Sequence, residues 1–342
     1  MGILPQVATL ILREHKQRPI TGDLLLIGRQ SVMLTADEAI ALLRREAIAV
    51  RSEFTLEIDK TTKGIDAGFI SDRTFFSMFS DARILALDVS DYEGAEIVHD
   101  LCTELPDRYS HIADFIYNGS CLDNLFDPAR AMRSISKMLR PYGRMMDVEH
   151  GTPRNGAFIC YSPEWFFDFF AVNDYADCQI LVCKFGRSLM SDWRVLWWRP
   201  YFSIGGKLRM SYPTFSEDFI TVSLAEKGAD STDDKTPIQG GYRVQQDPAA
   251  DAQYVNRYLA YLRSPRSFGF SKGFDQVFSW PLRLRSPEFV LAVFAKFGLD
   301  IKRGGSWGYE ISRAVPNFEQ NRVTAPYVGT LRGTGMHTAK TP

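Results

Sequence analysis

The first half of the chain alternates between short apolar runs and segments in which apolar side chains recur every three or four residues. Residues 22–30 contain a continuous apolar run, and the segments 84–89, 111–120 and 143–150, which mix apolar with polar residues, are predicted to be three further strands. Continuous apolar runs of this length are typical of strands that are buried on both faces. The intervening segments 34–50 and 126–141 have helical spacing. Strands that alternate with helices predict an α/β fold with a doubly wound, mostly parallel, Rossmann-like sheet.

The predicted helices carry start signals. Thr35 precedes the first helix, and Glu38, three residues later, completes a capping box. Pro128 lies near the first turn of the second helix, and Asp127 before it is predicted to be the N-cap. A further helix is predicted over residues 162–170, where closely spaced aromatic side chains indicate a buried face.

The pattern of apolar, aromatic and polar residues changes near residue 185. Residues 1–185 are predicted to form the sheet domain, and residues 186–342 a C-terminal α+β region that packs on it and serves substrate binding or oligomerisation. In that region, tryptophan and tyrosine side chains at 193–201 indicate core or a subunit contact rather than a sugar platform. The polar stretch 225–241 predicts a mobile loop, and residues 286–305 predict one more amphipathic helix.

The composition and net charge indicate which partners the chain is not expected to bind. The 342 residues are 45% hydrophobic and 24% charged, and the net charge near −1 gives no basic field for nucleic acid. The five cysteines form no CxxC pair and suit a reducing compartment. The apolar run near the N-terminus is too short to span a bilayer. We therefore expect a cytoplasmic protein with a small-molecule or sugar substrate, without nucleic acid or a membrane span; a homo-oligomer stays open.

Small and polar residues follow three of the predicted strands. They are Gly28, Arg29 and Gln30 after the first strand, Asp88 and Val89 after the second, and Asn118, Gly119 and Ser120 after the third. In an open parallel sheet, ligands bind at the carboxyl ends of strands, where the strand order reverses. Glycine lets a ligand approach the backbone, and a carboxylate can accept hydrogen bonds from both hydroxyls of a ribose. The sequence therefore predicts a ligand site at this edge.

The order of these parts resembles the class I methyltransferases that use S-adenosylmethionine. The resemblance is carried by a strand ending in glycine, a strand ending in aspartate, "IVHDL" (97–101), and "FIYNGSCLDNLFDPARAMRSISKMLRPYGRMM" (115–146). It covers about residues 20–185. It implies a methyltransferase fold, S-adenosylmethionine as the cofactor, and Asp88 as the acidic residue that binds ribose. Asp100 in "IVHDL" is either a loop carboxylate or a contact to the adenine amino group.

The segment "NGAFICYSPEWFFDFFAVNDYADC" (155–178) is similar to a stretch of bacterial methyltransferases associated with sugar and cell-surface polysaccharide pathways. The resemblance therefore implies O-methylation of a sugar or polysaccharide precursor. Methyl transfer to a hydroxyl needs alignment and a base of suitable pKa rather than a metal. His150 and Asp123 follow neighbouring strands and are the rival candidates for that base. No set of His, Cys and Asp residues has metal-ligand spacing, so no metal is predicted.

Two other functions stay open. Family members usually carry GxGxG after the first strand, whereas this chain has "GRQSV" (28–32), and Asp123 and Asn124 stand where the family commonly has a histidine. A non-catalytic protein that retains the methyltransferase fold and acts through protein contacts would explain both departures. A nucleotide-sugar enzyme with a nicotinamide cofactor is disfavoured by "GRQSV".

Overall fold

The computed structural model of the chain describes residues 2–59, 67–153, 156–186, 188–198, 201–202, 208–209, 218–239, 242–243, 248–266, 268, 299–304, 308–313 and 327–331. Nine strands of these residues form one mixed sheet, namely β1 (Asp23–Ile27), β2 (Arg83–Asp88), β3 (Ile97–Val98), β4 (Ala113–Gly119), β5 (Leu139–His150), β6 (Asp177–Lys184), β7 (Trp193–Trp198), β10 (Phe219–Glu226) and β13 (Tyr327–Leu331). The predicted α/β fold with a doubly wound sheet is confirmed.

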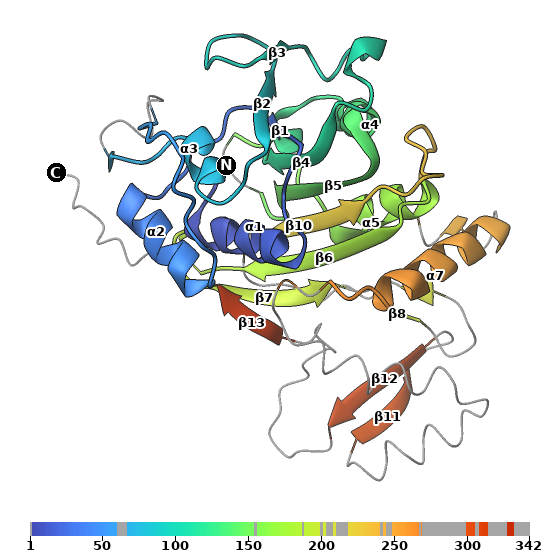
Figure 1. Cartoon of the computed structure of the whole chain (residues 1–342). Coiled ribbons are helices and arrows are strands. Elements are labelled where there is room, and N and C mark those ends of the chain that lie inside the picture. Colours follow the sequence, from blue (N-terminus) through green and yellow to red (C-terminus); the bar gives the residue numbers. More distant parts are fainter. Residues whose placement is uncertain are drawn as a thin grey trace.

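The order of strands across the sheet is β13-β7-β6-β10-β5-β4-β1-β2-β3. Strands β3, β2, β1, β4 and β5 pair in parallel, while β10 is antiparallel to both β5 and β6. The chain runs from β1 outward to β2 and β3, and then returns to the other side of β1 for β4 and β5 (Figure 1). The strand order therefore reverses between β1 and β4, which is where a parallel sheet opens a crevice for ligands.

Helices cover both faces of this sheet. They are α1 (Pro5–Gln17), α2 (Ala36–Arg45), α3 (Asp72–Ser77), α4 (Pro128–Met138), α5 (Pro163–Val172) and α7 (Pro248–Leu262), with 3-10 turns η2 (Asp107–Tyr109) and η3 (Leu122–Asn124). The predicted capping box of Thr35 and Glu38 is present at α2. Asp127 accepts a hydrogen bond from the Arg130 backbone N–H at 3.1 Å and caps α4, as predicted.

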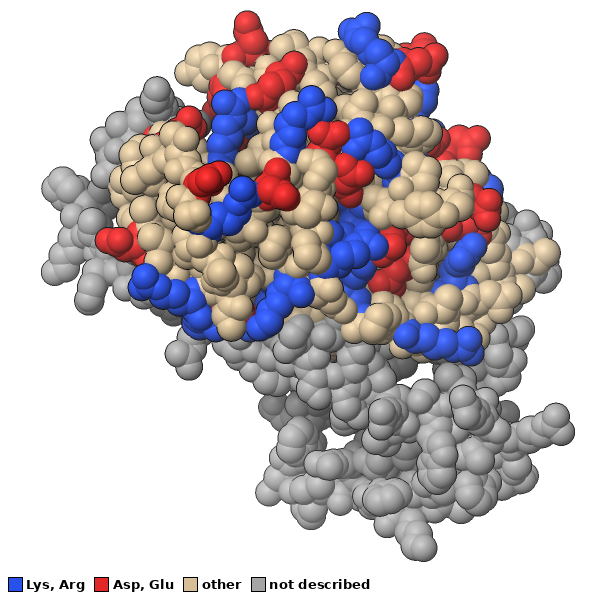
Figure 2. Space-filling model, viewed as in Figure 1, with Lys and Arg blue, Asp and Glu red and all other residues tan. Residues whose placement is uncertain are grey.

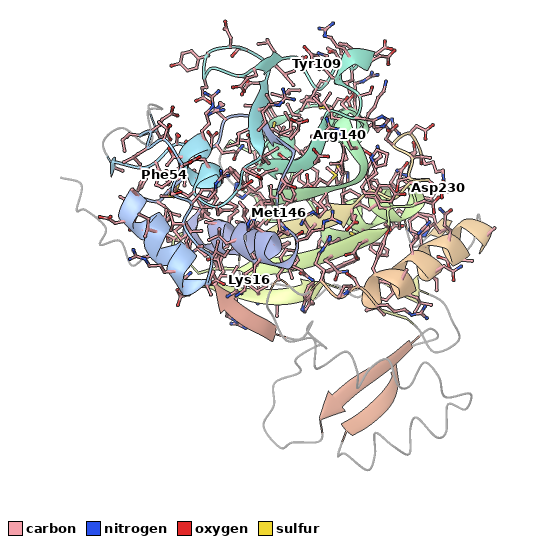
Figure 3. The ribbon with its side chains drawn as sticks, viewed as in Figure 1. Lys16, Phe54, Tyr109, Arg140, Met146 and Asp230 are labelled. Carbon is pink, nitrogen blue, oxygen red and sulfur yellow. The ribbon has the colours of Figure 1, made fainter. Side chains whose placement is uncertain are left out.

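The molecule has three layers, with α1, α2 and α3 on one face of the sheet and α4, α5 and α7 on the other (Figure 1). Each face has its own apolar core. Met146 of β5, labelled near the middle of Figure 3, is fully buried in the first core, and its neighbour Met145 is buried in the second. Because successive side chains of a strand point to opposite faces, a strand between two cores is apolar on both sides.

Strands from beyond residue 186 complete the main sheet, since β7, β10 and β13 all belong to it. The tryptophans Trp193, Trp197 and Trp198 on β7 are buried, which agrees with the expectation of core. Residues 227–239 contain no helix or strand, but they are anchored: the buried Lys227 donates to the carbonyls of Ser136 and Leu139. Hydrogen bonds from Lys227 therefore connect the start of the polar stretch to α4 and β5.

Other C-terminal elements form small sheets of their own. β8 (Tyr201–Phe202) pairs with β9 (Leu208–Arg209), and β11 (Leu299–Gly304) pairs with β12 (Gly308–Arg313). Of the helix predicted over 286–305, residues 286–298 lie outside the described residues, and 299–304 form β11.

The face of the molecule in Figure 2 carries Lys and Arg side chains interspersed with Asp and Glu. None of the helices in the described ranges combines the length and the apolar character needed to cross a membrane.

Candidate functional site

β1 ends in a glycine whose backbone conformation favours glycine. Gly28 has φ +72°, and its N–H donates to the carbonyl of Leu87 on β2 at 2.7 Å. A Cβ added at Gly28 would have Asp88 Oδ2, at 3.7 Å, as its nearest neighbour. The carboxyl end of β1 is therefore uncrowded on the side that faces the Asp88 carboxylate, and L side chains rarely adopt this φ.

Asp88 ends β2 and has two roles open to it. Its Oδ1 accepts a hydrogen bond from the Val89 backbone N–H at 2.7 Å, which stabilises the following turn. Its Oδ2 faces Gly28. The side chain of Val89 is 67% exposed and lies at the same edge of the sheet. Asp88 therefore caps a turn and still presents an oxygen toward the point where the strand order reverses.

The side chain of Gln30 folds back over the crevice between β1 and β4. Its Nε2 donates to the carbonyls of Ile27 at 2.9 Å and Gly28 at 3.2 Å, and Gln30 is buried. A Cβ added at Gly119 on β4 would collide with Gln30 Oε1, so Gly119 is required for this packing. The chain's own amide thus occupies the place that the strand-end rule assigns to a ligand.

Arg29 points away from that crevice, toward α3. Its Nη2 lies 2.5 Å from Oδ1 of Asp72, the first residue of α3, and the Gln30 backbone N–H donates to Asp72 Oδ2 at 2.8 Å. Burial raises the pKa of Asp72, and the Arg29 charge offsets part of that rise. This ion pair fixes the conformation of the loop that follows β1.

A row of polar side chains crosses three neighbouring strands on the face covered by α4 and α5. Asn118 of β4 lies opposite Asp147 of β5, and Ser223 of β10 lies opposite Asp147 on its other side. Asn118 Nδ2 donates to Asp147 Oδ1 at 3.1 Å, and Ser223 Oγ donates to Asp147 Oδ2 at 2.8 Å. All three residues are fully buried. Each carboxylate oxygen of Asp147 therefore has a donor, which buried polar groups require.

Glu149 holds the turn that follows β4. Its Oε1 accepts hydrogen bonds from Asn118 Nδ2 at 2.8 Å and from the Leu122 backbone N–H at 3.0 Å, and its Oε2 accepts from the Asp123 N–H at 3.2 Å. Tyr161 supports the same turn, since its hydroxyl donates to the Leu122 carbonyl at 2.8 Å. The position of Asp123 is thus determined by a buried carboxyl group on the neighbouring strand.

Asp123, Ser120 and His150 form the outer part of this cluster. The Ser120 hydroxyl donates to Asp123 Oδ2 at 2.5 Å, and His150 Nε2 lies 3.7 Å from the same oxygen. Ser120 has φ +67°, an unfavourable backbone for serine, and the Asn124 side-chain amide donates to its carbonyl at 2.8 Å. Asp123 Oδ1 is buried and has no hydrogen-bond partner in the described part of the chain. The two rival base candidates therefore lie together.

Burial shifts the protonation of the carboxyl groups in this cluster. It raises the pKa of Asp147 to about 6, although the hydrogen bonds from Asn118 and Ser223 lower it. Burial, followed by the charges of Asp123 and Asp147, raises the pKa of Glu149 well above its usual range. Buried carboxylates that share one space disfavour one another's ionisation. Asp147 and Glu149 therefore retain their protons at a pH where isolated carboxyl groups have lost theirs.

The structure brings most of the predicted site residues to one edge of the sheet. Gly28, Asp88 and Gln30 lie around the end of β1, while Asn118, Asp123 and His150 belong to the cluster at the ends of β4 and β5. Asp100 caps a turn, because its Oδ1 accepts from the Cys102 backbone N–H at 2.9 Å. The ligand-binding and catalytic roles of these residues stay predictions.

Sequence reasoning missed Asp72, Asp147 and Glu149. The sequence held a signal for Asp147 and Glu149, since residues two apart in a predicted strand point to the same face. Asp72 carried none, because its partner Arg29 is remote in sequence. Within the described ranges, no group of three or more His, Cys, Asp or Glu side chains is arranged to hold a metal ion.

No protein-family model matches this sequence, and no curated protein matches it. Among solved structures, the chain is similar to an S-adenosylmethionine-dependent methyltransferase from Archaeoglobus fulgidus, with 9% identity over 65% of this chain and 94% of that one and a TM-score of 0.33. It is similar to the YcgJ protein from Bacillus subtilis, with 10% identity over 65% of this chain and 97% of that one and a TM-score of 0.33. Some matches are covered only to about half of their own length, among them the CMeT domain of the citrinin polyketide synthase (10% identity, 66% of this chain, 52% of that chain, TM-score 0.34). At such identities the likeness concerns the fold alone.

Proposed function

We propose that this chain is a methyltransferase that uses S-adenosylmethionine, and that the cofactor crosses the carboxyl ends of β1, β2 and β4. The observation that carries the proposal is the left-handed Gly28 backbone beside the Asp88 carboxylate, at the reversal of strand order. A bare backbone admits a nucleoside, and Asp88 Oδ2 can accept hydrogen bonds from ribose hydroxyls. Val89 and Asp100 would border the adenine.

Binding of the cofactor requires Gln30 to leave the crevice. The Gln30 amide now donates to the carbonyls of Ile27 and Gly28, and the ammonium group of S-adenosylmethionine can donate to the same two carbonyls. A charged donor forms the stronger hydrogen bonds. Gly119 then presents bare backbone to the ligand, since Gln30 no longer covers it.

Methyl transfer from a sulfonium is a displacement in line with the breaking C–S bond, so the chain must align the acceptor and receive its proton. Asp123 and His150 are the candidates for the proton acceptor, and Glu149 positions Asp123 through the turn. Replacing the true base should lower turnover about a hundredfold or more while affinity for the cofactor stays nearly unchanged. Asp123→Asn and His150→Gln distinguish the two assignments.

Calorimetric titration with S-adenosylhomocysteine tests the proposal. Asp88→Ala should weaken binding about 10- to 150-fold, the range for a lost hydrogen bond to a charged group. Asp91→Ala, in the same exposed loop, is the matched control and should bind like the unchanged protein. Equal affinity of both variants would remove Asp88 from the site.

A non-catalytic role is the second candidate, and the buried Gln30 side chain is the observation that favours it. Gln30→Ala separates the two. If the crevice binds the cofactor, removing the competing amide should tighten the binding of S-adenosylhomocysteine. If the crevice is closed structure, Gln30→Ala should lower the free energy of unfolding, and neither protein should bind the ligand.

The resemblance also supports a finer proposal, O-methylation of a sugar or polysaccharide precursor. A sugar presents hydroxyls around its ring, so its site needs hydrogen-bonding side chains at the rim. Beside Asp123, the exposed side chains include the hydrogen-bonding Asn124 and Asp127 as well as the apolar Phe126 and Phe158.

A further inference from the structure

Two exposed phenylalanines lie near the backbone of the candidate base Asp123. Phe126 is 88% exposed and Phe158 is 68% exposed, and their rings meet edge to face with centroids 6.1 Å apart. Phe126 follows Asp123 by three residues in the sequence, and the Phe158 backbone N–H donates a hydrogen bond to the Asp123 carbonyl at 2.7 Å. The aromatic pair is therefore fixed beside the backbone of Asp123.

The Asp123 carboxylate lacks one hydrogen-bond donor among the described residues. Asp123 is 1% exposed, and its Oδ2 accepts from Ser120, but its Oδ1 has no partner among the described residues. A buried carboxylate oxygen without a donor is costly, so a ligand that supplies an O–H or N–H would complete the site. His150, 3.7 Å from Asp123 Oδ2, adds a second group that can exchange a proton.

We propose that Phe126 and Phe158 form the acceptor platform, and that the acceptor is a planar aromatic molecule with an ionisable hydroxyl. This inference rests on the proposed methyl transfer and names its acceptor class. The ring packs on the two phenylalanines, for which offset or edge-to-face contact is favourable. Its hydroxyl binds to the Asp123 and His150 side chains. A puckered sugar ring cannot form the offset or edge-to-face contact that a planar aromatic ring makes with the two phenylalanines.

The step balances without a further reactant. The acceptor oxygen forms a bond to the methyl carbon, and the C–S bond breaks with its electron pair remaining on sulfur, which becomes a neutral thioether. The proton of the hydroxyl passes to Asp123 or His150. A phenolic hydroxyl suits this site because its pKa, about 10 for tyrosine, lies far below that of a sugar hydroxyl.

The test uses 2-naphthol as the probe, titrated by its fluorescence into the full chain with S-adenosylhomocysteine present. We expect saturable binding, and Phe126→Ala and Phe158→Ala should each weaken it at least fivefold. Phe158→Leu, which keeps apolar area without the ring, should lose part of the affinity. Tyr142→Ala removes an exposed aromatic side chain (66% exposed) near the amino end of β5, and it should change nothing. Methyl α-glucoside should not compete.

Binding of S-adenosylhomocysteine to each variant is measured separately by calorimetry. The aromatic acceptor is refuted if S-adenosylhomocysteine binds normally but neither Phe→Ala substitution weakens the binding of naphthol. It is also refuted if methyl glucoside displaces naphthol. In both cases the methyltransferase proposal stands. If S-adenosylhomocysteine binds none of the proteins, the proposed function fails and the acceptor platform fails with it.

Discussion

Asp147→Asn should change how the stability of the protein depends on pH. Asparagine has nearly the shape of aspartate and keeps both contacts of Asp147: its oxygen accepts from Asn118, and its amide donates to the Ser223 hydroxyl. The substitution therefore removes an ionisation with little change in packing. Because Asp147 is fully buried, its ionisation lowers the free energy of unfolding.

The magnitude follows from the shift in pKa. Burial raises the pKa of Asp147 from 3.8 to about 6, so the folded state holds this proton more tightly than the unfolded chain does. The resulting stabilisation is complete below pH 3.8 and is lost as the pH rises through 6. It amounts to about 3 kcal/mol in total, of which about 1.4 kcal/mol is lost between pH 5 and pH 8. Glu149, whose pKa burial also raises, titrates in the same direction.

Urea unfolding followed by tryptophan fluorescence at pH 5 and pH 8 measures this difference. The unchanged protein should lose about 1.4 kcal/mol more than Asp147→Asn does between these two values. Asp91→Asn, in an exposed loop, should behave like the unchanged protein. Parallel pH profiles for the unchanged protein and Asp147→Asn would refute the reasoning, because they would mean that Asp147 carries no raised pKa in the fold.

Three further substitutions test the packing around the site. Thr35→Ala removes the cap of α2 and should lower the free energy of unfolding by about 1 kcal/mol in urea; an unchanged midpoint would show that the capping box contributes nothing. Arg29→Met should cost about 3 to 5 kcal/mol, since it leaves the buried Asp72 unpaired, and a loss below about 1 kcal/mol would contradict the buried pair. Tyr161→Phe removes the hydrogen bond to the Leu122 carbonyl and should cost about 1 to 3 kcal/mol by thermal unfolding, whereas neutrality would mean that water replaces the hydroxyl.

The strands of the first half were predictable because their signals are local. The apolar run 84–89 became Arg83–Asp88, and 111–120 became Ala113–Gly119, which are shifts of one or two residues. Turn-forming residues set those ends, and they act within a few positions of the chain. The rule that polar residues at carboxyl ends of parallel strands converge then placed Asp123 near His150.

The missed features depend on contacts between distant segments. Gln30 fills the crevice only because Gly119, on another strand, lacks a side chain, and no local pattern predicts that pairing. The insertion of β10 between β5 and β6 likewise depends on a register set across strands. The strand that contains the buried Glu149 was predicted, but the contact by which its carboxyl group positions the Asp123 turn joins two separate segments of the chain.

A crystal structure of the full chain with S-adenosylhomocysteine tests the central claim most directly. The account predicts that the ligand lies across the carboxyl ends of β1, β2 and β4, with its ribose hydroxyls on Asp88 and the Gln30 side chain turned out of the crevice. A ligand bound elsewhere, or crystals grown at saturating ligand in which Gln30 still donates to the carbonyls of Ile27 and Gly28, would contradict it.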